Sequence, residues 1–279
     1  MSIRLWHQSM APLDEFGAFA DMVREHLKAV VPADVIVDMH GSYPGSYLGG
    51  APAEVLPYPV VKHLIQEQIF DHCLTAEKEG YDAIALASFS EPFLTEVRSL
   101  VDIPVASMPE SCLLVGCSYA AKLALVTLTP KSIPRVRALV NQHGLTGRVG
   151  GIFALDPPIS ERILIGILNG EADPEPVLSS FTACARQAAA AGADLVIPAE
   201  GALNEVLWSH KLSVVDGVEV MDGLSVVMTY AHMMIRLKRV AGLGAARAIS
   251  HPMAPPALLA RAMRRARSGY PATGGDNQT

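Results

Sequence analysis

Short apolar segments alternate with amphipathic helical segments along most of this chain, and this alternation constrains the fold more than any other feature. The clearest apolar runs are SIRLW (2–6), DVIVDM (34–39), DAIALAS (82–88), KLALVTL (122–128) and DLVIPA (194–199). Such alternation is typical of parallel strands joined by covering helices. Continuous hydrophobic runs are typical of strands that are buried on both faces. The sequence therefore predicts an α/β protein with parallel sheets flanked by helices.

One pattern occurs twice. AEKEGYDAIALAS (76–88) and QAAAAGADLVIPAE (187–200) each contain a helix end, a glycine, an aspartate, an apolar strand and a polar residue at the strand tip. When Gly80 is aligned with Gly192, Ser88 is aligned with Glu200. The repeat predicts two pseudo-symmetric lobes. We assign residues 1–106 and 216–245 to the first lobe and residues 107–215 to the second.

Ser88 and Glu200 both stand at the carboxyl end of a predicted strand. Ligands of open parallel sheets bind beyond these ends. If the lobes face each other, the two side chains come from opposite walls of one cleft, and we predict that both are catalytic. The alternative is that each stabilises the start of the following helix, since Ser is a good N-cap and Glu suits the helix dipole.

Other polar residues follow the neighbouring strands. His40 ends the second strand, and we predict that it exchanges protons with Ser88 or with the substrate. The glycine-rich loop after it is interpreted as a mobile lid or as a plain surface loop. Thr129 precedes Pro130, so it also fits a helix cap. The predicted substrate contacts are His7, Gln8, Ser9, Tyr43, Tyr47, Phe89, Thr127, Thr129 and Gly201.

Composition excludes several classes of function. The net charge is −6, and no basic cluster of the kind that binds nucleic acid interrupts it. We find no apolar run of membrane-spanning length and no signal-type N-terminus, so we expect a cytoplasmic protein. The 4 cysteines form no CxxC pair and the histidines no HExxH motif, so we expect no metal. The end of the chain, residues 246–279, is predicted to be a partly disordered tail with a short basic helix at 256–267. It is interpreted as a packing segment or a contact within a homo-oligomer, and the alternative is a binding role for its arginines.

Three segments carry a resemblance to a known family: residues 80–116, KLALVTLTP (122–130) and GADLVIPAEGALNEVL (192–207). They resemble the aspartate/glutamate/hydantoin racemase superfamily, nearest to its hydantoin-racemase-like branch. The resemblance implies two lobes and a cofactor-independent racemase with one catalytic cysteine in each lobe. These cysteines fall on Ser88 and Glu200. A serine hydroxyl is a far weaker base than a thiolate, so symmetric chemistry between two thiols is not available.

The sequence leaves three functions open, all with a small molecule as partner and none with a cofactor. The first is a racemase or isomerase that moves a proton next to a carbonyl of a small carboxylic acid, amide or hydantoin-like cyclic ureide. Glu200 is then one base, with His40 or Ser88 on the other side. The second is a hydrolase or lyase that uses Ser88 or Glu200, with backbone N–H groups at Ser88 and Phe89 as an oxyanion hole. The third is a small-molecule binding protein without catalysis.

Overall fold

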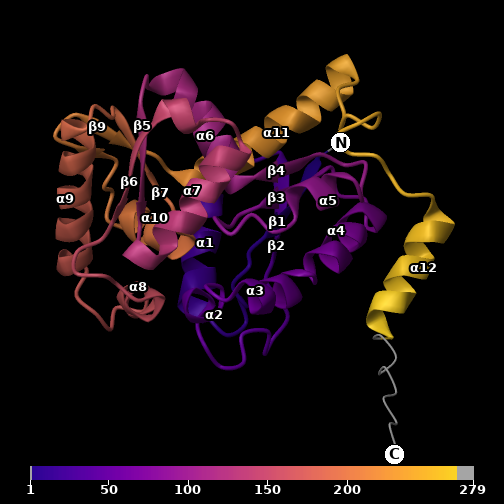
Figure 1. Ribbon diagram of the computed structural model, residues 1–279, viewed down its shortest axis with the longest axis horizontal. Coiled ribbons are helices and arrows are strands. Elements are labelled where there is room, and N and C mark those ends of the chain that lie inside the picture. The colour runs from indigo at the N-terminus through magenta and orange to yellow at the C-terminus, as the bar shows by residue number, and fades with distance from the viewer. Residues whose placement is uncertain (1, 269–279) are drawn as a thin grey trace, which may run out of the picture.

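A computed structural model describes residues 2–268, apart from the side chain of Ala53 (Figure 1). It confirms the predicted α/β fold with two sheets flanked by helices. The first sheet is parallel throughout and has the strand order β2-β1-β3-β4. Its strands are β1 (Ile3–Gln8), β2 (Val35–His40), β3 (Ala83–Leu86) and β4 (Val105–Ser107).

The second sheet has the order β6-β5-β7-β9-β8. Its strands are β5 (Leu123–Thr127), β6 (Val149–Ala154), β7 (Leu195–Pro198), β8 (Val214–Val215) and β9 (Val218–Val220). All pairs are parallel except the hairpin of β8 with β9 at the edge. The predicted lobe boundary between residues 215 and 216 falls within this hairpin.

The two halves repeat the same local structure, as the sequence pattern indicates. Gly80 and Gly192 follow equivalent helices, and both have a positive φ, +76° and +84°, a conformation that favours glycine. Asp82 N then donates to Arg4 O, and Asp194 N donates to Lys122 O. Each bond joins the start of one strand to the strand beside it. The repeated strand therefore lies next to the first strand of its own sheet in both halves.

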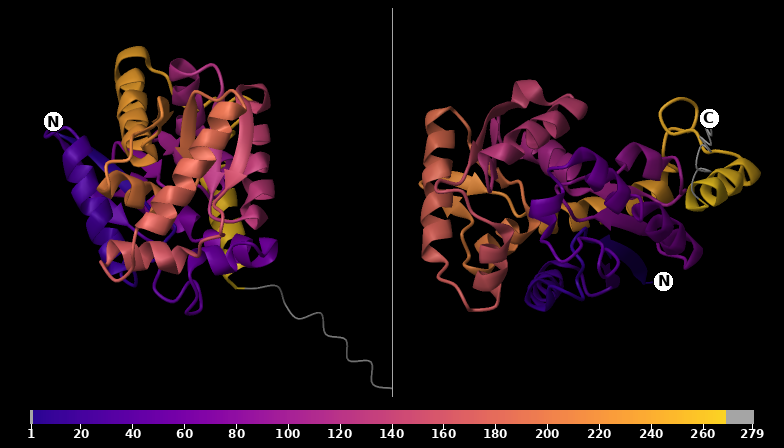
Figure 2. Two further views of the ribbon diagram at one scale, coloured as in Figure 1. Left: turned by 90° about the vertical axis from the view of Figure 1, so that its left-hand side faces the viewer. Right: turned by 60° about the horizontal axis from the view of Figure 1, so that its bottom comes forward.

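Helices cover both sheets. They are α1 (Gly17–Val30), α2 (Pro52–Val55), α3 (Pro59–Gln66), α4 (Ile69–Lys78), α5 (Leu94–Arg98), α6 (Met108–Tyr119), α7 (Ile133–Gln142), α8 (Glu161–Leu168), α9 (Glu175–Ala190), α10 (Gly201–Ser209), α11 (Gly223–Ala241) and α12 (Pro256–Arg267), with 3₁₀ turns η1 (Pro130–Ser132) and η2 (Thr146–Arg148). Figure 2 shows the purple N-terminal half beside the magenta-to-orange half, with α12 projecting at one end.

Two helices join the lobes. α6 leaves the first sheet and packs on β5 and β7 of the second, whereas α11 leaves the second sheet and packs on β3 and β4 of the first. The two helices also pack against each other. One hydrophobic core therefore runs through both halves, and it includes Leu5, Cys112, Leu125 and Val227. A smaller core, with Trp6, Ile69 and Ile84, lies in the first lobe only.

Some elements differ from the sequence prediction. The helical segment after residue 59 forms two helices, α3 and α4, separated by a turn at Glu67 and Gln68. α8 and β9 were not predicted; β9 has only three residues and gives no clear periodicity. The expected basic helix at 256–267 is α12. We expect disorder towards the end of the chain, but residues 269–279 lie outside the described part.

Candidate functional site

Ser88 lies two residues beyond the end of β3. Its Oγ is 2.9 Å from Ser90 Oγ and accepts a hydrogen bond from Ser90 N. The next helix, α5, begins only at Leu94. Ser88 therefore does not cap that helix; it forms a local turn with Ser90, and its side chain remains partly exposed.

Glu200 follows β7 and occupies the N-cap position of α10 without a side-chain capping hydrogen bond. Glu200 therefore has the backbone position of a helix cap, but its side chain makes no capping hydrogen bond. Burial raises the pKa of Glu200, and the Arg135 guanidinium and the Gly201 N–H offset only part of that rise. A carboxylate with a raised pKa at the end of a sheet strand is a stronger base than an ordinary carboxylate and is suited to proton transfer.

Arg135 connects the two strand tips, and the sequence analysis did not identify it. It lies on α7 and donates from Nη1 to the carbonyl oxygen of Phe89 at 2.8 Å. Its Nη2 is 3.6 Å from Glu200 Oε2. One guanidinium therefore contacts both the residue after Ser88 and the carboxylate of Glu200. Arg135 therefore links the loop that contains Ser88, after the first sheet, to Glu200 of the second sheet.

The loop after β2 also approaches Glu200. Tyr47 is 1% exposed, and its hydroxyl donates to the carbonyl oxygen of Met10. Burial raises the pKa of Tyr47, and the carboxylates of Glu161 and Glu200 raise it further. Tyr47 therefore anchors this loop within the electrostatic field of Glu200. Tyr43 is 51% exposed instead and packs on His72.

The predicted contacts at the end of β1 are buried. Gln8 accepts a hydrogen bond from Trp6 Nε1 and donates to Ser9 O, and Ser9 Oγ accepts from Ala11 N. Burial lowers the pKa of His7 to about 4. His7 is therefore neutral at physiological pH, and its Nδ1 has no hydrogen-bond partner among the described residues. Gln8 and Ser9 have their polar atoms engaged within the chain.

His40 ends β2, and β1 lies between β2 and β3. Two strand spacings, roughly 10 Å, therefore separate the ends of β2 and β3. The imidazole stacks on Trp6 with 3.3 Å between ring centroids. Burial lowers the pKa of His40, and Asp38 and Glu79 oppose this only in part. Ser88 is hydrogen-bonded to Ser90 rather than to His40 within the part of the chain that the structure describes.

The threonines at the end of β5 and just after it differ in their surroundings. Thr127 is fully buried, and its Oγ1 has no partner within residues 2–268. Thr129 occupies the N-cap position of η1, with its Oγ1 3.4 Å from Ser132 Oγ. Phe89 is 1% exposed, so its ring is core and its carbonyl is the group presented to Arg135. Gly201 is the first residue of α10.

A second acidic cluster lies beside this arrangement. Glu91 is 6% exposed and accepts hydrogen bonds from Ser107 Oγ, Gln142 Nε2 and His143 Nε2. Burial alone would lower the pKa of His143, but its contacts with Glu91 outweigh burial and raise it. The cluster links the β3–α5 loop to α7. The only sequence signal for this cluster is an acidic residue, Glu91, placed before Pro92 in the segment that follows a strand.

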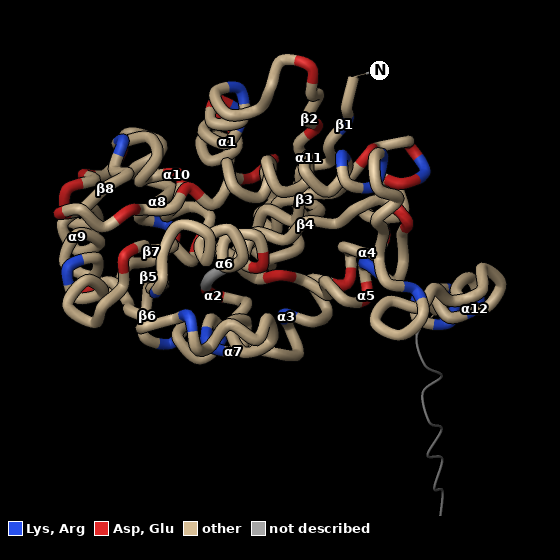
Figure 3. Tube along the Cα trace, turned by 90° about the horizontal axis from the view of Figure 1, so that it is seen from above, with Lys and Arg blue, Asp and Glu red and all other residues tan. Residues whose placement is uncertain are grey.

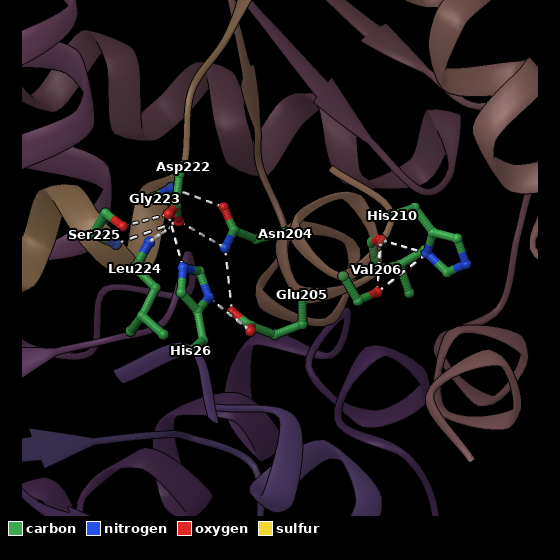
Figure 4. A network of polar contacts seen from close by, with 10 residues as sticks. His26, Asn204, Glu205, Val206, His210, Asp222, Gly223, Leu224 and Ser225 are labelled. Carbon is green, nitrogen blue, oxygen red and sulfur yellow. Dashed lines mark hydrogen bonds and ion pairs between the residues drawn. The ribbon is translucent and has the colours of Figure 1, made fainter. Parts of the chain in front are cut away.

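A third network joins α1, α10 and the start of α11 (Figure 4). His26 of α1 is fully buried between Glu205 of α10, at 2.9 Å, and Asp222 at the start of α11, at 2.7 Å. Asn204 donates to both carboxylates, and the His26 ring stacks on Trp208 at 4.0 Å. These contacts fix three helices relative to one another.

The cysteines do not supply an alternative site. Cys73 and Cys112 are fully buried, and burial raises the pKa of both thiols. A position near a helix start favours a lowered thiol pKa, but burial overrides that effect at Cys112. Within residues 2–268, no group of His, Cys, Asp and Glu side chains could hold a metal ion.

None of the helices described within residues 2–268 is long and apolar enough to cross a bilayer. Acidic and basic positions intermingle over both lobes (Figure 3).

The comparison with known proteins agrees with this geometry. The family model described as Asp/Glu/Hydantoin racemase matches residues 19–231. The chain belongs to the Asp/Glu/hydantoin racemase family. Hydantoin racemase of Pseudomonas sp. (strain NS671) is 25% identical over 61% of this chain and 64% of its own length, just under two thirds. Hydantoin racemase of Paenarthrobacter aurescens is 27% identical over 63% of this chain and 69% of its own.

Solved structures show the same fold. Allantoin racemase from Klebsiella pneumoniae superposes with a TM-score of 0.72 over 91% of this chain and 94% of its own, at 17% identity. This likeness extends over the lobes that contain Ser88 and Glu200. The two-lobed arrangement of the family is thus present although neither of these positions is cysteine.

Proposed function

We propose that this member of the racemase family moves a proton at a carbon next to a carbonyl, without a cofactor. The observation that carries the proposal is the Arg135 guanidinium, which contacts both Glu200 and the residue after Ser88. Such an arrangement supports a reaction in which groups from both lobes act on one small molecule. Glu200, with its raised pKa, is the base.

A cyclic ureide is the substrate class that the comparisons support. The matched relatives are named hydantoin racemases, and the superposed structure is named an allantoin racemase. In these compounds the carbon at the stereocentre is next to a ring carbonyl, so removal of its proton gives an enolate. Small carboxylic acids and amides with an acidic C–H belong to the same chemistry. The hydroxyl of Thr127, buried and unpartnered among the described residues, is a hydrogen-bond donor for an oxygen of such a substrate.

The two faces of the substrate carbon meet unequal groups in this proposal. Glu200 takes the proton from one face and becomes a carboxylic acid. Ser88 donates its hydroxyl proton to the other face. Water then returns a proton to the Ser88 oxygen, directly or through Ser90, to which Ser88 is hydrogen-bonded, and Glu200 releases its proton to water. Loss on one face and gain on the other inverts the configuration. The backbone N–H groups at the start of α10 favour the negative charge that develops on the enolate oxygen.

The hydrolase and lyase hypotheses lack such support. A serine nucleophile needs a base within hydrogen-bond reach. Ser88 has Ser90 as its side-chain partner, and His40 is stacked on Trp6 at the end of a strand that is not adjacent to β3. These hypotheses, and that of a non-catalytic binding protein, remain as distinct outcomes of the test.

The test is hydrogen exchange at the substrate carbon. The protein is incubated in deuterated water with single enantiomers of 5-benzylhydantoin and of allantoin, and exchange is followed by proton NMR and inversion by chiral chromatography, against the spontaneous rate. Glu200→Gln should lower the enzymatic exchange by a factor of about 10² or more. The control is Glu219→Gln, an exposed carboxylate of the same sheet. Ring opening without exchange would indicate a hydrolase instead, and binding without turnover would indicate a binding protein.

A further inference from the structure

A pocket of about 420 Å³ lies beside the Glu91 cluster, outside the arrangement of Ser88, Arg135 and Glu200. It is formed by α3, by the start of α5 and by the end of α7, helices that can be located in Figure 3. Its lining includes Lys62, Gln66, Glu91, Phe93, Leu94 and Glu96. The volume falls within the range of known small-molecule sites.

Two hydrogen-bond donors of the lining have no partner within the described residues. Gln66 is 2% exposed, and its Nε2 is buried without a hydrogen bond. Lys62 is half-buried, and no hydrogen bond or ion pair within residues 2–268 engages its ammonium group. A buried donor without a partner costs roughly 1–3 kcal/mol. Both residues lie on α3 one helical turn apart, so they face the pocket together.

The lining contains one lysine, Lys62, and two carboxylates, Glu91 and Glu96. Glu91 is hydrogen-bonded to His143, and Glu96 is exposed to solvent. Lys62 is therefore the cation of the lining, and no carboxylate within residues 2–268 pairs with it. Burial lowers the pKa of Lys62, and the charge of Arg135 lowers it further, against the opposite effect of Glu91. An anion bound beside Lys62 would raise the pKa of Lys62 again, because the anion stabilises the protonated amine.

Phe93, Leu94 and Pro59 form an apolar wall of the pocket, beside the polar side chains of Thr95 and Gln142. The Phe93 ring contacts His63 edge-on at 5.0 Å and lies 5.1 Å from Phe70, so its position is fixed from two sides. Leu94 next to it is buried, and Pro59 adds a further apolar surface. This wall suits a flat or aliphatic hydrocarbon group, with the polar end of the ligand directed at Lys62 and Gln66.

We propose that this pocket binds a small carboxylate with an apolar body, at a site separate from the proton-transfer residues. Lys62 forms an ion pair with the carboxylate, Gln66 Nε2 donates a second hydrogen bond to it, and Phe93 and Leu94 contact the body. The site goes beyond the proposed racemase activity and does not depend on it. Its proximity to Arg135, whose charge acts on Lys62, places it next to the catalytic groups.

Benzoate is a suitable probe. Its binding to the full-length protein is measured by isothermal titration calorimetry, with benzamide and benzylamine as compounds of similar shape that lack the negative charge. Lys62→Met and Gln66→Leu remove the two donors. Lys62→Gln removes the charge but keeps a polar side chain, and it replaces Lys62→Met should that variant fold poorly. Lys78→Met is the matched control, because Lys78 is exposed on α4 and does not line the pocket.

We expect benzoate to bind the wild type and the Lys78 variant equally and the amide and amine much more weakly. Loss of Lys62 or Gln66 should weaken binding by about tenfold. Equal affinity in the Lys62 variants, or no binding to the wild type, would refute the site. Benzoate affinity that is lost in Thr127→Val but kept in Lys62→Met would place the ligand near β5 and also refute it. Since binding is read without turnover, the result is independent of whether hydrogen exchange is found.

Discussion

The guanidinium of Arg135 lies 3.6 Å from the carboxylate of Glu200 while it also donates to the carbonyl oxygen of Phe89. Arg135 belongs to α7, Glu200 follows β7 and Phe89 follows β3, so three distant segments meet at one cation. Arg135 therefore has two effects. It holds the loop after Ser88 in place, and it lowers the pKa of a carboxyl group that burial raises.

Replacement of Arg135 by Met should shift the pH dependence of the reaction. Glu200 acts as a base only when it is ionised, so kcat/KM rises with pH through its pKa. Burial raises that pKa above the ordinary 4.5, and Arg135 partly lowers it. Without the cation the pKa rises further, and the acid limb of the profile of kcat/KM against pH moves to higher pH.

Two variants on the same helix make this experiment specific. Arg135→Lys retains a charge and should move the acid limb less than Arg135→Met. Arg137→Met removes an exposed cation of α7 and should leave the limb in place. An unchanged limb in Arg135→Met would show that Glu200 is not the titrating base.

Ser88→Ala should make the two enantiomers differ more strongly in hydrogen exchange. Glu200 alone can still exchange the proton of the enantiomer whose C–H faces it, whereas inversion also needs a donor on the other face. We expect exchange of one enantiomer to be largely kept and inversion to fall by about 10²-fold or more. Proton NMR in deuterated water combined with chiral chromatography separates the two rates. Full inversion by the Ala variant would exclude Ser88 as the donor.

The positions of Ser88 and Glu200 could be predicted because they depend on a local repeat. A glycine, an aspartate and an apolar strand fix where each strand ends, and the order of elements fixes that the ends lie on the same edge of each sheet. Arg135 could not be predicted in the same way. Its role depends on how closely α7 approaches the other lobe. Neither hydrophobic periodicity nor secondary-structure propensity predicts that distance.

The histidines illustrate the same difference. The sequence placed His7 and His40 at strand ends, which the structure confirms. Their protonation depends on burial and on stacking with Trp6, which are properties of the packed molecule. His26 and His143, in contrast, gave no sequence signal, because their carboxylate partners Glu205 and Glu91 are remote in the chain.

Gly41→Ala should destabilise the fold. A Cβ at this position would lie 2.6 Å from Ala11 O and 2.7 Å from Leu13 N, both backbone atoms. The loops after β1 and β2 would have to separate, so the free energy of unfolding should fall by about 1–3 kcal/mol. Urea denaturation measures this change. Gly17→Ala is the control, since nothing lies within 4 Å of a Cβ there; equal stability of the two variants would contradict the close approach of the loops.

His26 should make the stability of the protein depend on pH above neutrality. Burial disfavours its charged form, but the hydrogen bonds with Asp222 and Glu205 outweigh burial and raise its pKa from 6.5 to about 9. Below pH 6.5 both the folded and the unfolded chain bind this proton, so the contribution to stability is complete. Between pH 6.5 and about 9 only the folded chain retains it, so stability falls, by on the order of 3 kcal/mol in total.

The measurement is the free energy of unfolding between pH 6 and 10. His26→Asn should be less stable by about 3–5 kcal/mol near pH 6.5, because Glu205 and Asp222 then remain partly buried without their cation. It should also lose most of the decline above neutrality, so that the two curves converge as pH rises. His232→Asn, outside the network, should keep the wild-type slope. Parallel curves for wild type and His26→Asn would mean that His26 is neutral in the folded protein, and the network would then join the three helices by hydrogen bonds alone.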